Sequence, residues 1–295
     1  MRLDLAIELP PGYRREDVLT FHSRDAEAVA EQVSPGGLRK GVLLGGVPVV
    51  LEVAFDADVA DCTVNADGDM TPALLERARE ALLNILGLRI DPAAFAQFVR
   101  DDPALGPVVA RQPGLRIIQS ATVFEALTWA IIGQQINLPF AISLRRTFIQ
   151  LAGRTHASGL WSYPEAADVA RLELEALTSR KFSRAKAETL LRLAQLVVDG
   201  QVRLDRDLPV DQFVQQLLAV KGIGPWTVNY TLLRGYGYPD CSLEGDVAVR
   251  TALHRLLGGE ARPDIPTAQR LLERYAPHRT MAAAYLWASL SDQAG

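Results

Sequence analysis

The chain has 295 residues, of which 48% are hydrophobic and 22% charged, and its formal net charge is −4. This length suits two domains, or one domain with a large extension, and the composition is that of a folded globular protein. The negative charge argues against a protein that coats nucleic acid by electrostatics alone, because phosphate neutralisation supplies most non-specific affinity. The acidity is concentrated in residues 1–100, which hold 10 Lys and Arg against 16 Asp and Glu.

Cysteine usage and hydropathy exclude further classes of protein. Cys62 and Cys241 lie far apart and outside any C-x-x-C pair, so the sequence carries no disulfide framework and no zinc or iron–sulfur signature. No stretch fits a signal peptide, and no uncharged apolar run reaches about 18 residues. We therefore expect a cytoplasmic protein that neither spans a membrane nor is addressed to one.

The first hundred residues predict a small α+β unit. Strand-like apolar patterns cover residues 3–9, 41–46, 47–55 and 61–65. The Gly45-Gly46 pair between two of these strands suits a hairpin turn. Apolar spacing near 3.6 residues predicts helices over residues 23–32 and 71–86. Ser23 and Thr71 suit the N-caps of these helices, and Gly87 suits the end of the second.

Beyond Pro113 the pattern changes to helices joined by short loops, with no strand pattern of comparable strength. The predicted helices cover residues 121–133, 138–152, 164–177, 184–198, 210–219, 224–235, 247–257, 267–275 and 278–290. Residues 101–114, rich in Pro, Gly and charge, form the predicted connection. The expected fold class is α+β: an N-terminal domain over 1–105, with a small antiparallel sheet and helices, precedes an all-helical core over 106–295.

The segment LLAVKGIGPWTVNYTLL, residues 217–233, ends one amphipathic helix almost directly before the next begins. Gly222 and Gly224 permit positive φ and close backbone approach, while Ile223 anchors the turn in the core. Exposed amides at the start of the second helix then form an anion site, for which DNA phosphate is the natural ligand. An ordinary helix-to-helix turn with a glycine cap also explains the G-x-G motif taken alone.

Asp246 and three aromatic residues are the other candidate site residues. Asp246 directly precedes an apolar helical run, where it is well placed as an N-cap. Trp226 and Tyr230 are four residues apart and share one helix face, and Trp287 lies in the C-terminal helical segment. Capping by itself accounts for the aspartate, and core packing accounts for each aromatic residue. The residues alone leave both interpretations open.

The runs GIGPWTVNY and SLEGDVAVRTAL, residues 222–230 and 242–253, together resemble the helix-hairpin-helix DNA glycosylase superfamily, and within it the DNA-3-methyladenine glycosylase II group. The resemblance covers residues 115–290 well and the N-terminal part loosely. It implies a small α+β domain before a helical core with a DNA cleft. In that family the aspartate at position 246 is catalytic, and aromatic residues at 226, 230 and 287 bind the base.

The resemblance implies hydrolysis of the bond between a flipped base and its sugar. The reaction passes through a sugar with oxocarbenium character, which one fixed carboxylate, Asp246, stabilises while it orients or deprotonates a water. Alkylation at N3 or N7 of a purine already makes the base a good leaving group, so a general acid is not required. Bifunctional relatives carry a lysine where this chain has Trp226, so we expect base removal without strand cleavage and without a cofactor.

The resemblance assigns DNA contacts to two turns. The first turn, the hairpin, contributes Lys221, Gly222, Ile223 and Gly224. Gln135, at the end of the helix in FEALTWAIIGQQINLPFA, residues 124–141, matches the wedge that fills the gap left by the flipped nucleotide. Some relatives carry an apolar residue at this wedge position.

Three details of these turns stay open. Ile136 or Leu138 are alternative wedges, and a polar helix end followed by Asn137 as an N-cap is the structural alternative. The resemblance also implies a monovalent cation at the hairpin, held by the backbone carbonyls of Leu218, Val220 and Ile223.

We therefore predict a monomeric, monofunctional DNA glycosylase of base excision repair, acting near the bacterial nucleoid on double-stranded DNA that contains 3-methyladenine or 7-methylguanine. One alternative is a helix-hairpin-helix module that grips damaged or bent DNA without chemistry. Another is a glycosylase for oxidised or mismatched bases, which the absence of the strand-cleaving lysine and of a four-cysteine cluster disfavours.

Overall fold

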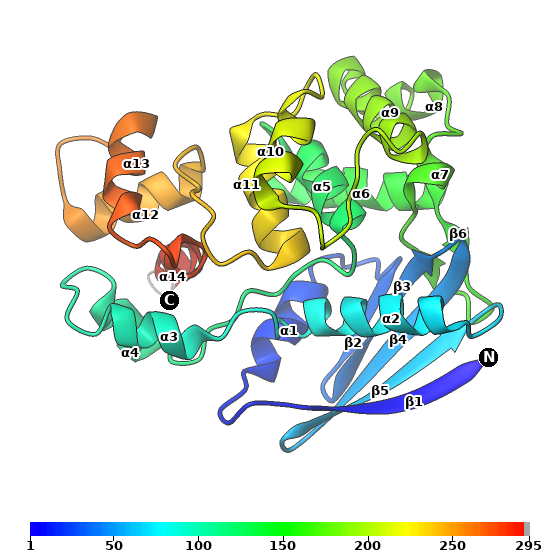
Figure 1. The fold of residues 1–295 in the computed structure, drawn as a ribbon, viewed down its shortest axis with the longest axis horizontal. Coiled ribbons are helices and arrows are strands. Elements are labelled where there is room, and N and C mark those ends of the chain that lie inside the picture. Colours follow the sequence, from blue (N-terminus) through cyan, green and yellow to red (C-terminus); the bar gives the residue numbers. More distant parts are fainter. Residues whose placement is uncertain (292–295) are drawn as a thin grey trace.

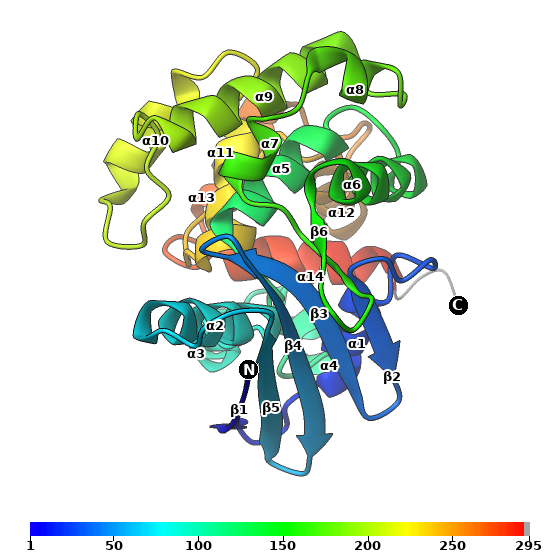
Figure 2. The same ribbon diagram turned by 90° about the vertical axis from the view of Figure 1, so that its right-hand side faces the viewer.

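The computed structural model describes residues 1–291 and contains a five-stranded antiparallel sheet followed by a helical region (Figure 1). The strand order is β1-β5-β4-β3-β2. The strands are β1 (Arg2–Glu8), β2 (Glu31–Ser34), β3 (Gly37–Leu44), β4 (Val47–Asp56) and β5 (Val59–Ala66). Figure 2 shows this sheet below and most of the helices above it. The fold class expected from the sequence is confirmed.

The β3–β4 hairpin closes where the sequence predicts. Leu44 pairs with Val47, so the loop holds only Gly45 and Gly46. Their φ angles are +63° and +79°, which a two-residue turn of the type that matches strand twist requires at both positions. Glycine adopts these angles without steric cost.

Helices α1 (Arg15–His22) and α2 (Pro72–Ile85) share one hydrophobic core with the sheet. Helix α2 begins as expected, because Thr71 Oγ1 accepts the N–H of Leu74 at 3.2 Å and Pro72 fits the first turn. Gly87, with φ +65°, follows its C-terminal end.

The helix expected over residues 23–32 is wrong. Helix α1 lies earlier in the chain and ends at His22, so Ser23 follows a helix instead of starting one. Residues 31–34 form the edge strand β2, which pairs only with β3. The apolar spacing in this stretch therefore reflects a turn followed by a strand.

Asp25 determines the path of the chain after α1. Its carboxylate accepts the amides of Glu27 at 3.2 Å and Val29 at 3.5 Å, and it pairs with Arg146 at 2.6 Å. Ala28 has φ +50°, which a right-handed helix cannot accommodate. A tertiary ion pair thus stabilises a turn where local propensity favours a helix.

The sequence predicted neither α3 (Pro92–Phe98) nor α4 (Gly106–Arg111), which lies in the expected connection over residues 101–114. The remaining helices closely follow the predicted series. They are α5 (Val123–Gly133), α6 (Leu138–Ala152), α7 (Ala166–Val169), α8 (Leu174–Thr178), α9 (Arg184–Val198), α10 (Val210–Leu218), α11 (Pro225–Thr231), α12 (Val247–Leu257), α13 (Ile265–Glu273) and α14 (Arg279–Ser291), with a π-helical segment η1 (Leu232–Tyr236) after α11. The predicted helix 164–177 is two short helices. Within residues 1–291, no helix is long and apolar enough to cross a bilayer.

Two features differ from the expected division into an α+β domain and an all-helical core. The strands β6 (Arg154–Thr155) and β7 (Trp161–Ser162) form a short hairpin, and Tyr163 bridges to Val42 of β3. Helix α3, assigned to the N-terminal domain by sequence, packs against α14, where Phe95 stacks on Tyr285 at 5.7 Å (Figure 1). Because contacts cross residue 105 in this way, the division of the chain at that point remains a proposal.

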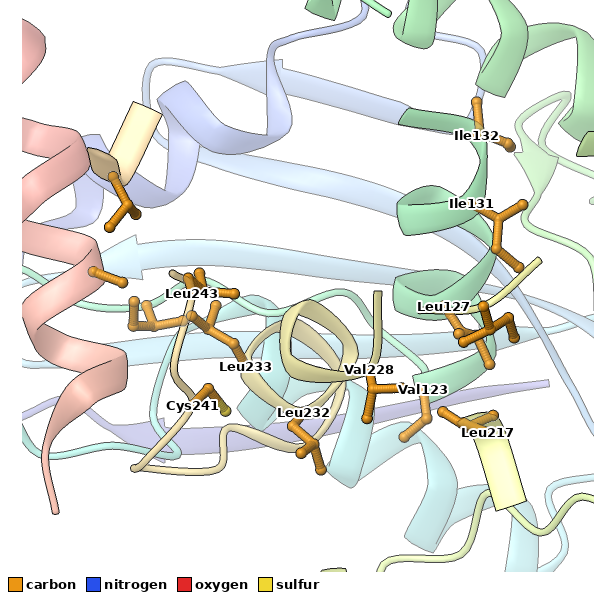
Figure 3. Close-up of a cluster of buried hydrophobic side chains, with 14 of the residues drawn as sticks. Val123, Leu127, Ile131, Ile132, Leu217, Val228, Leu232, Leu233, Cys241 and Leu243 are labelled. Carbon is orange, nitrogen blue, oxygen red and sulfur yellow. The ribbon is translucent and has the colours of Figure 1, made fainter. Parts of the chain in front are cut away.

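Helix α5 lies in the middle of the helical core. Val123, Leu127 and Ile131 of α5 are buried in the same hydrophobic cluster as Val228 of α11 and Leu233 of η1 (Figure 3), and α5 contacts both of these elements. Each such side chain contributes about 1.5–3 kcal/mol when it is fully buried. This packing fixes the C-terminal end of α5 beside the turn that begins α11.

Candidate active site

The turn between α10 and α11 has the tight geometry expected from the sequence. The N–H of Val220 donates to the carbonyl of Leu217, and the N–H of Ile223 donates to the carbonyl of Val220, each at 3.0 Å. Gly222 has φ +99°, a left-handed conformation that favours glycine. Ile223 is buried and anchors the turn in the core.

The two glycines of this turn have different surroundings. A Cβ on Gly222 would lie 2.1 Å from Oγ1 of Thr189 in α9, so packing as well as φ requires glycine there. Gly224 is extended, with φ −113°. The sequence allowed a positive φ at this glycine, but the structure does not have one. A Cβ on Gly224 would meet nothing within 4 Å, and Lys221 is exposed. This side of the turn is open to an incoming molecule.

A second turn, after α5, lies against the first. The side-chain amide of Gln134 donates to the carbonyl of Gly222 at 3.1 Å and to Oγ1 of Thr227 at 3.0 Å. The next residue, Gln135, is exposed and has φ +56°. A left-handed conformation costs a non-glycine residue about 1–3 kcal/mol and persists only where the surroundings impose it. Leu138 is half exposed, whereas Ile136 packs against the core.

Asp246 is the N-cap of α12, as its sequence position predicts. Its Oδ1 accepts the N–H of Val249 at 3.0 Å and the indole N–H of Trp287 at 3.2 Å. Its Oδ2 accepts the indole N–H of Trp226 at 3.1 Å. All three of its side-chain partners among the described residues are neutral N–H groups. They fix the orientation of the carboxylate without neutralising its charge.

The three candidate aromatic residues lie together beside Asp246. The ring centroids of Trp226 and Tyr230 are 5.1 Å apart, and those of Tyr230 and Trp287 are 6.5 Å apart. Each of the three side chains is half-buried. Residues from α11, α12 and α14, separated by up to 61 positions from Trp226 to Trp287, thus form one aromatic site around one carboxylate.

Trp129 is a member of this site that sequence reasoning missed. Its indole N–H donates to the hydroxyl of Tyr230 at 3.0 Å. It lies on α5, within the FEALTWAIIGQQ segment, so its position in a matched motif was the available signal. The contact joins α5 to α11 across 101 residues.

Phe21 and Arg234 were also missed. The guanidinium carbon of Arg234 lies 5.3 Å from the ring centroid of Trp287 and 5.0 Å from that of Phe21. Arg234 follows Tyr230 by one helical turn, which is the one sequence signal for its position. Phe21 comes from α1, and no local pattern relates it to the helical core.

A buried ion-pair network fixes α5, and with it Trp129, to the sheet. Lys40 of β3 pairs with Glu31 at 2.5 Å and with Glu125 at 2.8 Å, and Arg145 of α6 pairs with the same two carboxylates at 3.1 and 2.7 Å. Burial alone would raise the pKa of both carboxyl groups, but Arg145 and Lys40 hold each pKa below its usual range. The network therefore stabilises the fold around the site.

The cation implied at the hairpin stays a prediction. Of the three carbonyls, that of Val220 already accepts the N–H of Ile223. A carbonyl has a second lone pair, so this bond does not exclude a cation. Among residues 1–291, no cluster of three or more His, Cys, Asp or Glu side chains is arranged to hold a metal ion.

Comparison with known proteins matches the chain to one family and one fold. A family model described as HhH-GPD superfamily base excision DNA repair protein matches residues 128–278. A DNA-3-methyladenine glycosylase of Bacillus subtilis (strain 168) is 30% identical over 294 residues, 96% of each chain. DNA-3-methyladenine glycosylase 2 of Escherichia coli (strain K12) is 28% identical and covers 94% of each chain. The solved 3-methyladenine DNA-glycosylase from Archaeoglobus fulgidus has a TM-score of 0.82 at 23% identity, over 98% of this chain and 99% of that one.

Proposed function

Because this chain belongs to the HhH-GPD superfamily of base excision DNA repair proteins and is a DNA glycosylase, we propose that it hydrolyses the bond between an alkylated base and its deoxyribose. The relatives from Bacillus subtilis and Escherichia coli are named for 3-methyladenine, which supports 3-methyladenine in duplex DNA as a substrate. We propose 7-methylguanine as a second substrate, because alkylation at N7 also makes the purine a good leaving group. We further propose that it acts as a monomer.

The carboxylate of Asp246 carries this proposal. Hydrolysis places positive charge on the sugar, and a preorganised negative group nearby stabilises that charge. The indole N–H groups of Trp226 and Trp287 and the amide of Val249 hold the carboxylate in place without neutralising it. The same carboxylate takes the proton of the attacking water. Loss of a cationic alkylated base needs no second carboxylate.

The aromatic site accounts for selectivity toward damaged bases. A base that is flipped out of the duplex stacks on Trp226, Tyr230 and Trp287, which lie beside Asp246. Alkylation at N3 or N7 leaves the purine positively charged, and a cation is attracted to the face of an aromatic ring. An unmodified base gains less from the same rings.

The two turns are proposed to hold the DNA. Lys221 and the open backbone at Gly224 contact phosphate, and Gln135 enters the gap left by the flipped nucleotide. Gly224→Ala is expected to weaken duplex binding a few-fold for every sequence, because the new Cβ stands between the turn and the phosphate. The fold should be unaffected, since that Cβ meets no protein atom within 4 Å. A loss that depends on DNA sequence would contradict this contact.

We propose that the enzyme does not cleave the strand. Strand cleavage through a Schiff base needs an amine nucleophile, and position 226 holds a tryptophan. The chain has four lysines: Lys40, Lys181, Lys186 and Lys221. Lys40 is buried in the ion-pair network and Lys186 donates to the carbonyl of Ile132, so neither is free to attack the sugar.

Release of free base from methylated duplex DNA tests the proposal. Wild type should release 3-methyladenine and 7-methylguanine, and Asp246→Asn should release them far more slowly. Asp264→Asn is the matched control, because Asp264 caps α13 through the N–H of Thr267 at 2.9 Å but is exposed on the surface. Denaturing gels run without alkali should show intact strands.

Three results would contradict parts of this proposal. Equal release by wild type and Asp246→Asn would remove the catalytic role of the carboxylate. Nicked strands without alkali would remove the monofunctional assignment. No release by any of the three proteins would remove alkylated bases as the substrate.

A further inference from the structure

A cavity lined by arginines lies beside the aromatic site and shares Trp287 with it, but its arginines play no part in the chemistry described above. Its volume is about 570 Å³, and its walls come from α1, residues 111–118, η1 and α14. The arginines in its wall are Arg14, Arg24, Arg111, Arg116 and Arg234. Asp17, the acidic side chain among the described residues of this wall, is paired with Arg14 at 2.7 Å. The cavity is therefore strongly positive in a chain of net negative charge.

Two of these arginines have unused hydrogen-bond donors. Arg234 is 9% exposed; its Nη1 donates to the carbonyl of Ile118 at 2.5 Å, but its buried Nε has no partner. Arg24 forms no hydrogen bond or ion pair with any residue of the described chain, and its guanidinium lies 4.1 Å from the ring centroid of Phe21. Guanidinium groups carry donors only, so a ligand that uses these donors must supply acceptors.

The positive charges of the cavity also act on one another. Partial removal from water and the charge of Arg234 lower the pKa of Arg24 to about 10. Burial lowers the pKa of Arg116 as well. An anion among these groups would stabilise their charged forms and offset both effects.

We infer that this cavity binds a phosphate group. The planar fork of a guanidinium matches the oxygens of phosphate, and several such groups around one cavity are a common means of recognising it. The rings of Phe21 and Trp287 line the same cavity and offer a surface for the sugar or base attached to the phosphate. Two sources share this chemistry: a backbone phosphate of bound DNA and a free nucleotide.

The cavity shares a wall with the proposed catalytic site. The indole of Trp287 donates to Asp246, and the guanidinium of Arg234 lies 5.3 Å from the centroid of the same ring. A phosphate bound by Arg234 would therefore lie close to Trp287, which orients the carboxylate of Asp246. This link to catalysis rests on the proposed function, whereas phosphate binding itself does not.

Titration calorimetry at low ionic strength tests for a free nucleotide. The probes are inorganic phosphate and deoxyadenosine 5′-monophosphate, with deoxyadenosine as the ligand that lacks phosphate. Arg24→Gln should weaken phosphate and nucleotide binding about tenfold or more, because it removes a charged donor. Arg15→Gln is the matched control, since Arg15 is exposed on α1, pairs with Glu16 and lies outside the cavity. Arg24 has no hydrogen bond to lose, so Arg24→Gln should fold normally.

The salt dependence of binding to a duplex with an abasic-site analogue tests for a DNA phosphate. Each phosphate contact contributes a slope of about −0.9 to the plot of log K against log salt concentration. If DNA supplies the phosphate, Arg24→Gln should reduce the slope by about one, and Arg15→Gln should leave it unchanged. A nucleotide affinity lost in Arg24→Gln with an unchanged slope would identify a free nucleotide as the source.

The inference is overturned if wild type binds neither phosphate nor nucleotide and the slope is the same in wild type and Arg24→Gln. Equal effects of Arg24→Gln and Arg15→Gln would also overturn it, because they would reflect general charge only. Both assays measure binding at equilibrium, so their outcome is separate from base release. Both assays therefore test phosphate binding even in a protein that releases no base.

Discussion

Asp246 and Glu125 are both carboxylates at the start of a helix, yet their surroundings differ in kind. Asp246 caps α12, is partly exposed and accepts three neutral N–H groups. Glu125 lies in the first turn of α5, is 3% exposed, and pairs with Lys40 at 2.8 Å and Arg145 at 2.7 Å. One charge is oriented but left unbalanced, and the other is balanced by buried cations.

This difference separates a carboxylate that acts on a substrate from one that stabilises the fold. The negative charge of Glu125 is already balanced by Lys40 and Arg145, so it would stabilise a positive charge on a sugar only weakly. A carboxylate that is held only by N–H dipoles keeps its negative charge available to stabilise the positive charge on the sugar. It needs no reorientation during the reaction, because folding has already fixed its position. Both side chains are carboxylates at the N-terminal end of a helix, one at the N-cap and one in the first turn, so their partners account for the difference in role.

The largest expected effect is on catalysis. Asp246→Asn should reduce single-turnover base excision by about 100- to 10,000-fold, the range typical for loss of a positioned catalytic group. Its stability should change little, because asparagine caps a helix about as well as aspartate. Urea unfolding measured beside the excision rate checks both parts. If Asp246→Asn is destabilised enough to explain its lost activity, Asp246 has a structural role like that of Glu125 and the contrast between the two carboxylates fails.

Glu125→Gln should have the opposite profile. Removal of one carboxylate from the buried ion-pair network leaves the two cations Lys40 and Arg145 with Glu31 alone, at a cost of up to about 3–5 kcal/mol in unfolding free energy. Excision by the folded fraction should fall much less than in Asp246→Asn. Glu188→Gln is the control, since the surface pair of Glu188 with Arg184 contributes no more than about 1 kcal/mol. Similar losses of stability in both variants would contradict the role of the network.

The same network predicts how stability depends on pH. The folded-state pKa values of Glu31 and Glu125 lie below the ordinary value of 4.5, so both groups add stability above that pH. This contribution is lost as the pH falls below about 4.5 and through the lower folded-state values. Unfolding free energies measured from pH 7 to pH 3 should fall accordingly, and the fall should be smaller in Glu125→Gln. If the pH profile of that variant equals the wild-type profile, Glu125 does not contribute to the pH dependence of stability.

The smallest effect concerns the N–H groups that orient Asp246. Trp226→Phe keeps an aromatic ring for stacking but removes the donor at 3.1 Å from Oδ2. We expect about a tenfold slower excision, the scale of one hydrogen bond to a charged group, with duplex binding nearly unchanged. Trp161→Phe, in β7, serves as the control outside the site. An equal loss of excision and duplex binding would mean that Trp226 packs the fold instead.

Local patterns predicted much of the fold and the centre of the site. The caps at Thr71 and Asp246, the left-handed glycine at Gly222 and the buried Ile223 depend on a few neighbouring residues, and all were found where the sequence indicates. The resemblance to the DNA-3-methyladenine glycosylase II group is confirmed by the family match and the relatives. The roles assigned to the individual site residues stay predictions.

Long-range contacts account for what the sequence did not predict. The turn after α1 depends on the pair of Asp25 with Arg146, 121 residues away, which no local spacing reports. The edge strand β2 exists because β3 is beside it, and a four-residue strand has too few positions for a clear alternation. The short strands β6 and β7 were missed for the same reason.

The sequence by itself therefore determined the series of helices from α5 onward, the tight turn at residues 221–224 and the presence of a carboxylate and aromatic residues at matched positions. The tertiary structure alone decided that Trp226 and Trp287 donate to one carboxylate and that Trp129 donates to Tyr230. It also decided that Arg234 lies over the rings of Phe21 and Trp287. The reason is physical: caps and turns are set by backbone geometry within a few residues, whereas the charge balance of a side chain depends on neighbours that only the packed fold brings near.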